Sequence, residues 1–205
     1  MKASDISRAG KALPGAPDTL VAAVAERAAR EGVVDISYGE MDSPLGTLVL
    51  AVTDRGLVRL AFADSNPDAL PDLARTLSPR ILRRPAKTDS ARRELDEYFN
   101  GMRRDFDTPL DWALIRGFGR RVLEAAVAIP FGQVSTYLAV ATQAGNPRAS
   151  RATGNALGAN PIPIIIPCHR VLRTGGGYGG YTGGIHRKER LLRIEGVSQE
   201  RLPDL

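Results

Sequence analysis

The sequence predicts a mixed α/β protein with two domains behind a short N-terminal extension. Two observations predict this class: β-rich runs separated by turn sequences fill the first half, and amphipathic helical patterns replace them from Phe118 onward. The 205 residues, 43% of them hydrophobic, suffice for one core or two small ones. We place the extension at 1–32, the first domain at 33–108 and the second at 109–205.

The extension and the first domain have simple local patterns. PDTLVAAVAERAAREG, residues 17–32, predicts a short helix with Asp18 as its cap and a terminating glycine. VVDISYGEM, GTLVLAVTD and LVRLAFAD, separated by SPLG and RG, predict a small antiparallel sheet. We expect a helix around 67–77, a strand near 80–84 and a helix in ARRELDEYFNG. No group of side chains in this domain points to catalysis.

In the second domain, helical patterns replace the β-rich runs of the first. RDFDTPLDW reads as a linker or a last strand, and residues 118–129 predict a helix with Val122, Leu123, Ala126 and Ile129 on one face. The text from Ser135 to Gly158 predicts a helix, a turn at 145–147 and a second helix, the outline of a helix-turn-helix. Many folds share that outline. The following TGGGYGGYTGG, residues 174–184, predicts a backbone loop.

Composition narrows the function classes. A net charge of +5 and a pI near 9.7 suit a polyanionic partner, although charge alone favours an ordinary solvated basic surface. One cysteine excludes an internal disulfide, and with only two histidines a zinc cluster is implausible, so we expect no metal. The chain shows neither a secretion signal nor an apolar run of membrane-spanning length, so we expect a cytoplasmic protein without membrane contact.

The single cysteine lies in IIIPCHR, between Pro167 and His169. A free thiol has a pKa of about 8.5 and reacts as its thiolate, so activation requires a nearby base or positive dipole. His169 is the candidate base. Neighbouring side chains on an extended segment point to opposite faces, so contact would require a turn or a bridging water. The alternative is a buried, inert cysteine beside a histidine that bonds to backbone.

NPIPIIIPCHR, followed by VLRTGGGYGGYTGGIHRKERLLRIEG, resembles the active-site signature of the O6-alkylguanine-DNA alkyltransferases. The resemblance covers 118–196 and is strongest over 160–171; SPLGTLVLAVTDRGLVRLAF and ELDEYFNG extend it loosely to the first domain. It implies an RNase H-like α/β domain followed by a mainly helical, winged-helix-like domain. It further implies DNA repair without a cofactor, in which an alkyl group moves irreversibly from the O6 of guanine, less readily the O4 of thymine, to one cysteine.

The resemblance also implies roles for residues around the cysteine. Cys168 would be the alkyl acceptor, His169 the base that takes its proton through a bound water, and Glu195 the acid that orients the histidine. Asn160 would be a hinge whose amide ties the helix-turn-helix to the cysteine segment. Taken alone, Glu195 reads as a surface charge on a helix and Asn160-Pro161 as an ordinary turn.

A base inside the stack is out of reach of a protein sulfur, so the family extrudes it. Tyr137 would press on the phosphate of the target nucleotide and approach the purine with its hydroxyl, and Arg151 would enter the duplex in its place. Val171 and the stretch Gly179, Gly180, Tyr181 and Thr182 would line the base pocket, with Tyr181 stacking on the base or closing over it. In isolation Tyr137 is a half-buried aromatic residue and Arg151 a solvated charge.

The second helix of the helix-turn-helix has a small leading face, made of Ala149, Ser150, Ala152 and Gly154. Such a face permits close approach to DNA and offers few groups that read base edges, unless the helix simply packs on the core. The family places this helix in the minor groove. We therefore expect a monomer that binds alkylated double-stranded DNA without sequence preference, with cooperativity, alkyl size and the role of residues 1–32 left open.

Two other functions compete with alkyl transfer. The first is a lesion-binding module that flips alkylated bases without reacting. Such modules have another residue in place of the cysteine, and because this chain retains Cys168, the sequence argues against that function. A helix-turn-helix regulator requires base-reading side chains, which the small face lacks.

Some relatives bind zinc in the first domain through cysteine and histidine, and this chain has neither residue there.

Overall fold

The computed structural model of the chain describes residues 23, 27–28 and 31–197. They form two compact units that interleave along the sequence. Within the described part, the first unit holds residues up to 42, 47–93 and 108–114, and the second holds 43–46, 94–107 and 115–197. The expected domains, 33–108 and 109–205, are contiguous, so the sequence pattern did not anticipate that 94–107 packs in the second unit. Those domain boundaries stay a prediction.

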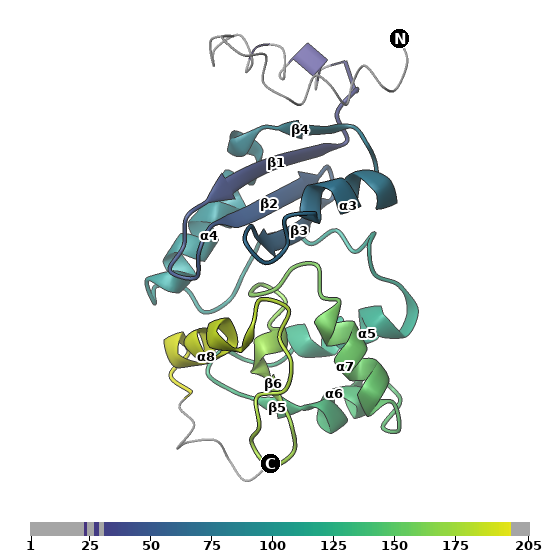
Figure 1. Ribbon diagram of the computed structural model, residues 1–205, viewed down its shortest axis with the longest axis vertical. Coiled ribbons are helices and arrows are strands. Elements are labelled where there is room, and N and C mark those ends of the chain that lie inside the picture. Colours follow the sequence, from purple (N-terminus) through teal and green to yellow (C-terminus); the bar gives the residue numbers. More distant parts are fainter. Residues whose placement is uncertain (1–22, 24–26, 29–30, 198–205) are drawn as a thin grey trace. The chain divides into compact units, whose positions relative to one another are not determined.

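The first unit is built on a four-stranded sheet (Figure 1). Its strands are β1 (Ile36–Met41), β2 (Leu48–Thr53), β3 (Gly56–Phe62) and β4 (Ile81–Arg83), in the order β3-β2-β1-β4. The first three pair antiparallel, which confirms the predicted sheet. β4 pairs parallel to β1, with Ile36 opposite Ile81.

Helices cover the sheet because its apolar faces need partners. On one side Leu73 of α3 (Ala69–Thr76) packs in a core with Ile36, Ala51 and Val58. The turn η1 (Pro85–Thr88) lies so close to β1 that a Cβ at Gly39 would stand 2.7 Å from the Thr88 hydroxyl. The helix α4 (Asp89–Phe99) follows η1, and its residues from Glu94 on belong to the second unit.

The segment after 107 resolves the choice between a linker and a last strand. Leu57 donates its backbone N–H to Pro109 and accepts from Asp111, each over 2.8 Å, so Leu110 forms a parallel bridge with Leu57. The segment thus pairs with β3 at one position, as a last strand reduced to a single bridge.

The second unit contains the predicted helix-turn-helix. Its described elements are α5 (Gly117–Val127), β5 (Ser135–Thr136), α6 (Tyr137–Gln143), α7 (Ser150–Gly158), η2 (Cys168–Arg170), β6 (Val171–Leu172) and α8 (Ile185–Ile194). Gly145 has a φ of 87°, which favours glycine, and the Asn146 side chain accepts from the Arg148 N–H, so the turn between α6 and α7 falls where the sequence places it. β5 and β6 pair in parallel, which brings the start of α6 beside the segment after Cys168.

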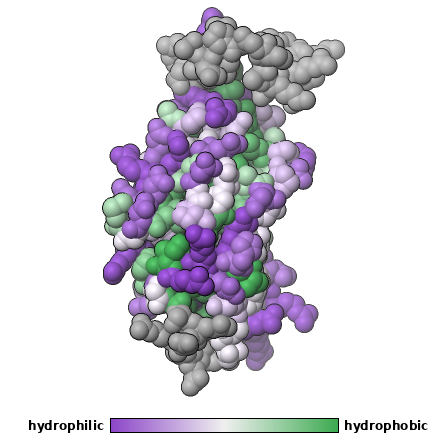
Figure 2. Space-filling view, turned by 60° about the vertical axis from the view of Figure 1, so that its left-hand side comes forward, coloured by the Kyte–Doolittle hydropathy of each residue, from purple (hydrophilic) through white to green (hydrophobic). Residues whose placement is uncertain are grey.

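Other expectations concern the ends and the surface. Of the helix predicted over 17–32, the structure describes Ala23, Arg27 and Ala28 as helical; the remainder, with Asp18, lies outside the described residues apart from the turn at 31–32. No helix in the described part has the length and apolarity needed to cross a bilayer. On the face in Figure 2, hydrophilic side chains predominate, with smaller apolar areas between them.

Candidate functional site

The cysteine segment is folded back on itself instead of extended. The Ile166 N–H donates to Ile162 O over 2.9 Å, and Ile164 holds a φ of 75°, an unfavourable value for a β-branched residue. Cys168 then begins the single-turn helix η2. A turn, one of the two arrangements expected to bring Cys168 and His169 together, is therefore present.

Asn160 connects the end of α7 to the reactive sulfur. Its Nδ2 donates to Ile166 O over 2.8 Å and lies 3.1 Å from Cys168 Sγ, and its Oδ1 accepts from the Ile162 N–H over 3.0 Å. The side chain is buried. These contacts join the two segments that the resemblance assigns to a hinge, and the hinge role itself stays a prediction.

Glu195 is a buried carboxylate at the C-terminal end of α8, not a surface charge. Its Oε1 lies 2.8 Å from His169 Nε2. Arg170 binds both oxygens, with Nε donating to Oε2 over 2.9 Å and Nη2 to Oε1 over 3.0 Å. Tyr98 Oη and the Gly132 N–H donate to the same group over 2.7 and 3.3 Å. The carboxylate thus organises a polar network whose side chains are buried.

The ionisation of this network follows from burial and pairing. Burial alone would raise the pKa of Glu195, but the hydrogen bonds and charges of His169 and Arg170 outweigh it and lower the pKa to about 2. Burial raises the pKa of the Cys168 thiol, against the opposing effects of the Asn160 amide and the Lys188 charge. Burial lowers the pKa of His169, although Glu195 opposes it. At rest the site holds a thiol, a neutral imidazole and a carboxylate.

A neutral imidazole beside a carboxylate carries its proton on the nitrogen that faces the carboxylate. For His169 that nitrogen is Nε2, so the lone pair is on Nδ1. Nδ1 is buried and has no hydrogen-bond partner among the described residues. The histidine is therefore prepared to accept one proton from another group.

Cys168 opens into a pocket of about 670 Å³ within the second unit. The walls come from α6, α7, the cysteine turn and the glycine loop. The lining residues are Tyr137, Ser150, Arg151, Gly154, Leu157, Gly158, Cys168, Arg173, Gly180, Tyr181 and Thr182. The structure therefore brings most of the predicted base-pocket and DNA-facing residues together around the thiol.

Four of the predicted base-pocket and DNA-facing residues do not line this pocket. Val171 is fully buried in β6, where its carbonyl accepts a hydrogen bond from Lys188. Gly179 packs directly against Tyr137, whose hydroxyl a Cβ at this position would overlap. Ala149 precedes α7, and Ala152 is exposed on that helix without lining the pocket. Val171 and Gly179 support the wall from behind, because one is a core strand residue and the other a close backbone contact.

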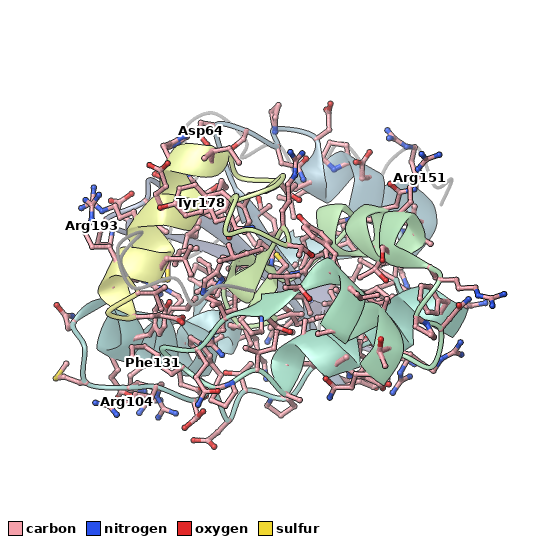
Figure 3. The ribbon with its side chains drawn as sticks, turned by 90° about the horizontal axis from the view of Figure 1, so that it is seen from below. Asp64, Arg104, Phe131, Arg151, Tyr178 and Arg193 are labelled. Atoms are coloured by element: carbon pink, nitrogen blue, oxygen red, sulfur yellow. The ribbon has the colours of Figure 1, made fainter. Side chains whose placement is uncertain are left out.

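Tyr137 is fixed at the first position of α6. The Thr136 hydroxyl caps that helix by accepting from the Ala139 N–H over 3.1 Å. A Cβ at Gly154 would lie 3.7 Å from the Tyr137 ring, so the small face of α7 both packs on this ring and lines the pocket. Tyr181 stands edge-on to His169, with ring centroids 6.5 Å apart, and Thr182 bonds to Gly158 O over 2.6 Å. Figure 3 shows Arg151 projecting outward from α7.

Sequence reasoning missed four residues of this site. Arg170, beside His169, could have been read as the partner of a buried acid, and Arg173 as a cation near the glycine loop. Lys188 is fully buried, its amine donates to Val171 O and Tyr178 O, and burial lowers its pKa to about 8. Tyr98 lies 97 positions from Glu195, so no local pattern reveals their contact. The described residues contain no group of three or more histidine, cysteine or acidic side chains that could hold a metal ion.

Comparison with known proteins places this geometry in a family. Residues 36–112 match the ribonuclease-like domain of 6-O-methylguanine DNA methyltransferase, and residues 117–197 match its DNA-binding domain. The methylated-DNA–protein-cysteine methyltransferase of Mycobacterium tuberculosis is 38% identical over 167 residues, which span 78% of this chain and 92% of that protein. The chain belongs to the methylated-DNA–protein-cysteine methyltransferase family. The predicted fold class, with a ribonuclease-like first part and a helical DNA-binding second part, is confirmed.

Further members of the family agree. The namesake from Sulfolobus acidocaldarius is 37% identical over 168 residues, covering 82% of this chain and 97% of that protein. The crystal structure of the M. tuberculosis O6-methylguanine methyltransferase has a TM-score of 0.67 at 37% identity, covering 82% of this chain and 95% of the other. The M. tuberculosis OGT in complex with DNA has a TM-score of 0.66 at 39% identity, covering 78% and 93%.

Proposed function

We propose that this chain repairs DNA by direct reversal, moving an alkyl group from the O6 of guanine, and less readily from the O4 of thymine, to Cys168. The observation that carries the proposal is the pocket: the chain's only cysteine stands at its wall, in contact with a buried Asn160 and next to the His169–Glu195 pair. Transfer uses up the protein, since the thioether that forms is chemically stable.

The first step is ionisation of the thiol. The proton leaves Cys168 Sγ for His169 Nδ1, directly or through one water, and the resulting imidazolium is stabilised by Glu195 across the 2.8 Å contact. The Asn160 amide and the Lys188 charge favour the thiolate over the thiol. Because burial opposes ionisation, we expect proton transfer to accompany binding of the alkylated base.

The second step is displacement at the alkyl carbon. A bond forms between Cys168 Sγ and that carbon while the bond from the carbon to O6 breaks, and its electron pair remains on the purine. The Tyr137 hydroxyl, on the pocket wall, donates a hydrogen bond to the purine as its negative charge develops. The purine anion then takes up one proton from solvent and His169 returns its extra proton to solvent, so the products are unmodified guanine, an alkylated Cys168 and a neutral imidazole.

The target base must leave the helix to reach this site. Arg151 projects from the beginning of α7, and its guanidinium forms no hydrogen bond or ion pair within the described part of the chain. We assign it to the space that the extruded base vacates. The small residues Ser150 and Gly154 allow α7 to approach the minor groove of any sequence, as expected for a monomer that scans DNA. A lone reduced thiol suits the cytoplasm.

One observation favours a second function. Burial raises the pKa of Cys168, which is also the state of an unreactive cysteine in a protein that binds lesions without repairing them. Mass spectrometry separates the two. After incubation with duplex DNA containing O6-methylguanine, alkyl transfer adds one methyl group to the peptide that holds Cys168, whereas a sensor binds the same duplex and leaves that peptide unmodified.

A further inference from the structure

Tyr98 contacts the site from a segment that sequence comparison assigns to the ribonuclease-like domain. It lies on α4, inside the stretch 36–112 that matches the ribonuclease-like domain, yet it belongs to the second compact unit. Its side chain is fully buried, and its hydroxyl donates to Glu195 Oε1 over 2.7 Å. The ribonuclease-like sequence thus supplies one ligand to the carboxylate beside His169.

The Tyr98 ring is held in one position by other aromatic rings. Phe99 and Phe106 lie 5.5 and 5.3 Å from it, centroid to centroid, and Phe131 lies 6.1 Å away at nearly a right angle. Phe131 directly precedes Gly132, whose N–H donates to the other oxygen of Glu195. Arg104 lies over the Phe131 ring (Figure 3), at 5.5 Å from its centroid. A buried hydroxyl on a ring so enclosed has a fixed direction.

Three donors converge on Glu195 Oε1: Tyr98 Oη at 2.7 Å, His169 Nε2 at 2.8 Å and Arg170 Nη2 at 3.0 Å. Arg170 holds both oxygens and would, by itself, let the carboxylate tilt toward the guanidinium and away from the imidazole. The neutral hydroxyl of Tyr98 is the donor that keeps Oε1 in reach of Nε2 from a second direction.

We propose that Tyr98 is a positioning residue of the transfer site, whose hydroxyl holds Glu195 Oε1 against His169 Nε2 so that His169 can take the proton of Cys168. This inference rests on the proposed function, in which protons pass from Cys168 to His169 and Glu195 stabilises the charged histidine; these three residues form the relay. It gives the stretch 94–107 a part in the chemistry, although that stretch never touches the thiol pocket.

Other ionisable groups face this relay. Lys188, whose pKa is about 8, loses its own charge at alkaline pH, so the thiol pKa of Tyr98→Phe is compared with that of wild type over the same pH range. Lys188 acts on both Cys168 and His169, and Arg170 acts on His169, Tyr98 and Glu195. Tyr181 and Tyr137 stand near Cys168, and burial raises the pKa of each, so both stay neutral. Replacing Tyr98 by phenylalanine alters none of these groups and removes one oxygen atom.

The chain's single cysteine makes the test direct, because every alkylation by iodoacetamide reports on Cys168. The rate of that reaction against pH gives the pKa of the thiol without any DNA. We expect Tyr98→Phe to raise this pKa by about one unit, which is about tenfold less thiolate at neutral pH. Methyl transfer from DNA to Tyr98→Phe should be slower than to wild type by about the same factor at pH 7. Above the thiol pKa of the variant, the two proteins should react at the same rate. A merely structural defect would persist at every pH.

The matched control is Tyr38→Phe. Tyr38 is half-buried in the first unit, and its hydroxyl forms no hydrogen bond within the described residues, so this change should leave the thiol pKa unaltered. In a Glu195→Gln background the effect of Tyr98→Phe should vanish, because the hydroxyl acts through the carboxylate. An unchanged thiol pKa in folded Tyr98→Phe, or a shift that persists in the Glu195→Gln background, overturns the proposal.

Two further measurements separate a folding defect and a different function from a positioning role of Tyr98. If Tyr98→Phe does not fold, Phe106→Leu loosens the ring without removing the hydroxyl; a smaller upward shift of the thiol pKa supports the proposal and no shift overturns it. Wild-type protein that takes up no methyl group, combined with the expected shift in Tyr98→Phe, removes alkyl transfer as the function and leaves the positioning role of Tyr98 intact.

Discussion

The amide nitrogen of Asn160 lies 3.1 Å from the sulfur of Cys168 while its oxygen accepts from the Ile162 N–H. One side chain therefore fixes the backbone before the cysteine and offers a donor to the thiolate. A hydrogen bond to a charged group contributes about 1.5–3 kcal/mol. This donor thus offsets part of the burial that opposes ionisation of Cys168.

Asn160→Asp should raise the thiol pKa, because it replaces the donor with a carboxylate beside the sulfur while keeping the size of the side chain. We expect transfer at pH 7 to slow at least tenfold. The check is the pH dependence of iodoacetamide alkylation, with Asn155→Asp as the control, since Asn155 is exposed on α7. Equal thiol pKa values in Asn160→Asp and wild type would exclude Asn160 from stabilising the thiolate.

Arg151→Ala should slow transfer from duplex DNA by about tenfold or more and leave transfer from a single strand nearly unchanged. The reason is that only a duplex presents a stacked gap that the guanidinium can fill. Arg193→Ala is the matched control, because Arg193 also projects outward in Figure 3 but lies on α8, outside the pocket wall. Equal slowing on both substrates would remove Arg151 from this role.

Glu195 also makes stability depend on pH. The pKa of this carboxyl is about 2 in the folded chain, against an ordinary value of 4.5, so its contribution is complete above about pH 4.5 and is lost as the pH falls toward 2. A shift of this size corresponds to on the order of 3 kcal/mol. Glu195→Gln should be less stable than wild type at pH 7, and the difference should shrink through that window.

Chemical denaturation at several pH values measures this contribution. Glu189→Gln is the control: Glu189 lies on the same helix, and its replacement should change the stability little. A gap between wild type and Glu195→Gln that stays constant from pH 5 to pH 2 would mean that folding does not lower the pKa of Glu195.

The sequence predicted the elements that local patterns determine. Alternation and turn sequences located β1 to β3, and Gly145 with Asn146 located the turn between α6 and α7. The parallel pairing of β4 with β1 was not predicted, because register between distant strands depends on tertiary packing.

At the site, the residues near Cys168 in sequence were within reach of prediction, and their partners were not. PCHR drew attention to Cys168 and His169. The burial of Glu195 could not be read from a charged helix end, and Tyr98 joins the network from a distant segment through one hydrogen bond. Val171 and Gly179 lie behind the pocket wall, because a residue that supports a wall and one that lines it have similar sequence patterns.

Transfer of radiolabelled methyl from duplex DNA containing O6-methylguanine, counted per molecule of protein beside a Cys168→Ala control, tests the central claim most directly. We predict uptake that stops near one methyl per chain and no uptake by Cys168→Ala, which should still bind the duplex, because DNA binding relies on α7 and not on the thiol. Uptake by Cys168→Ala, or tight binding by the wild-type chain without uptake, would contradict alkyl transfer to Cys168.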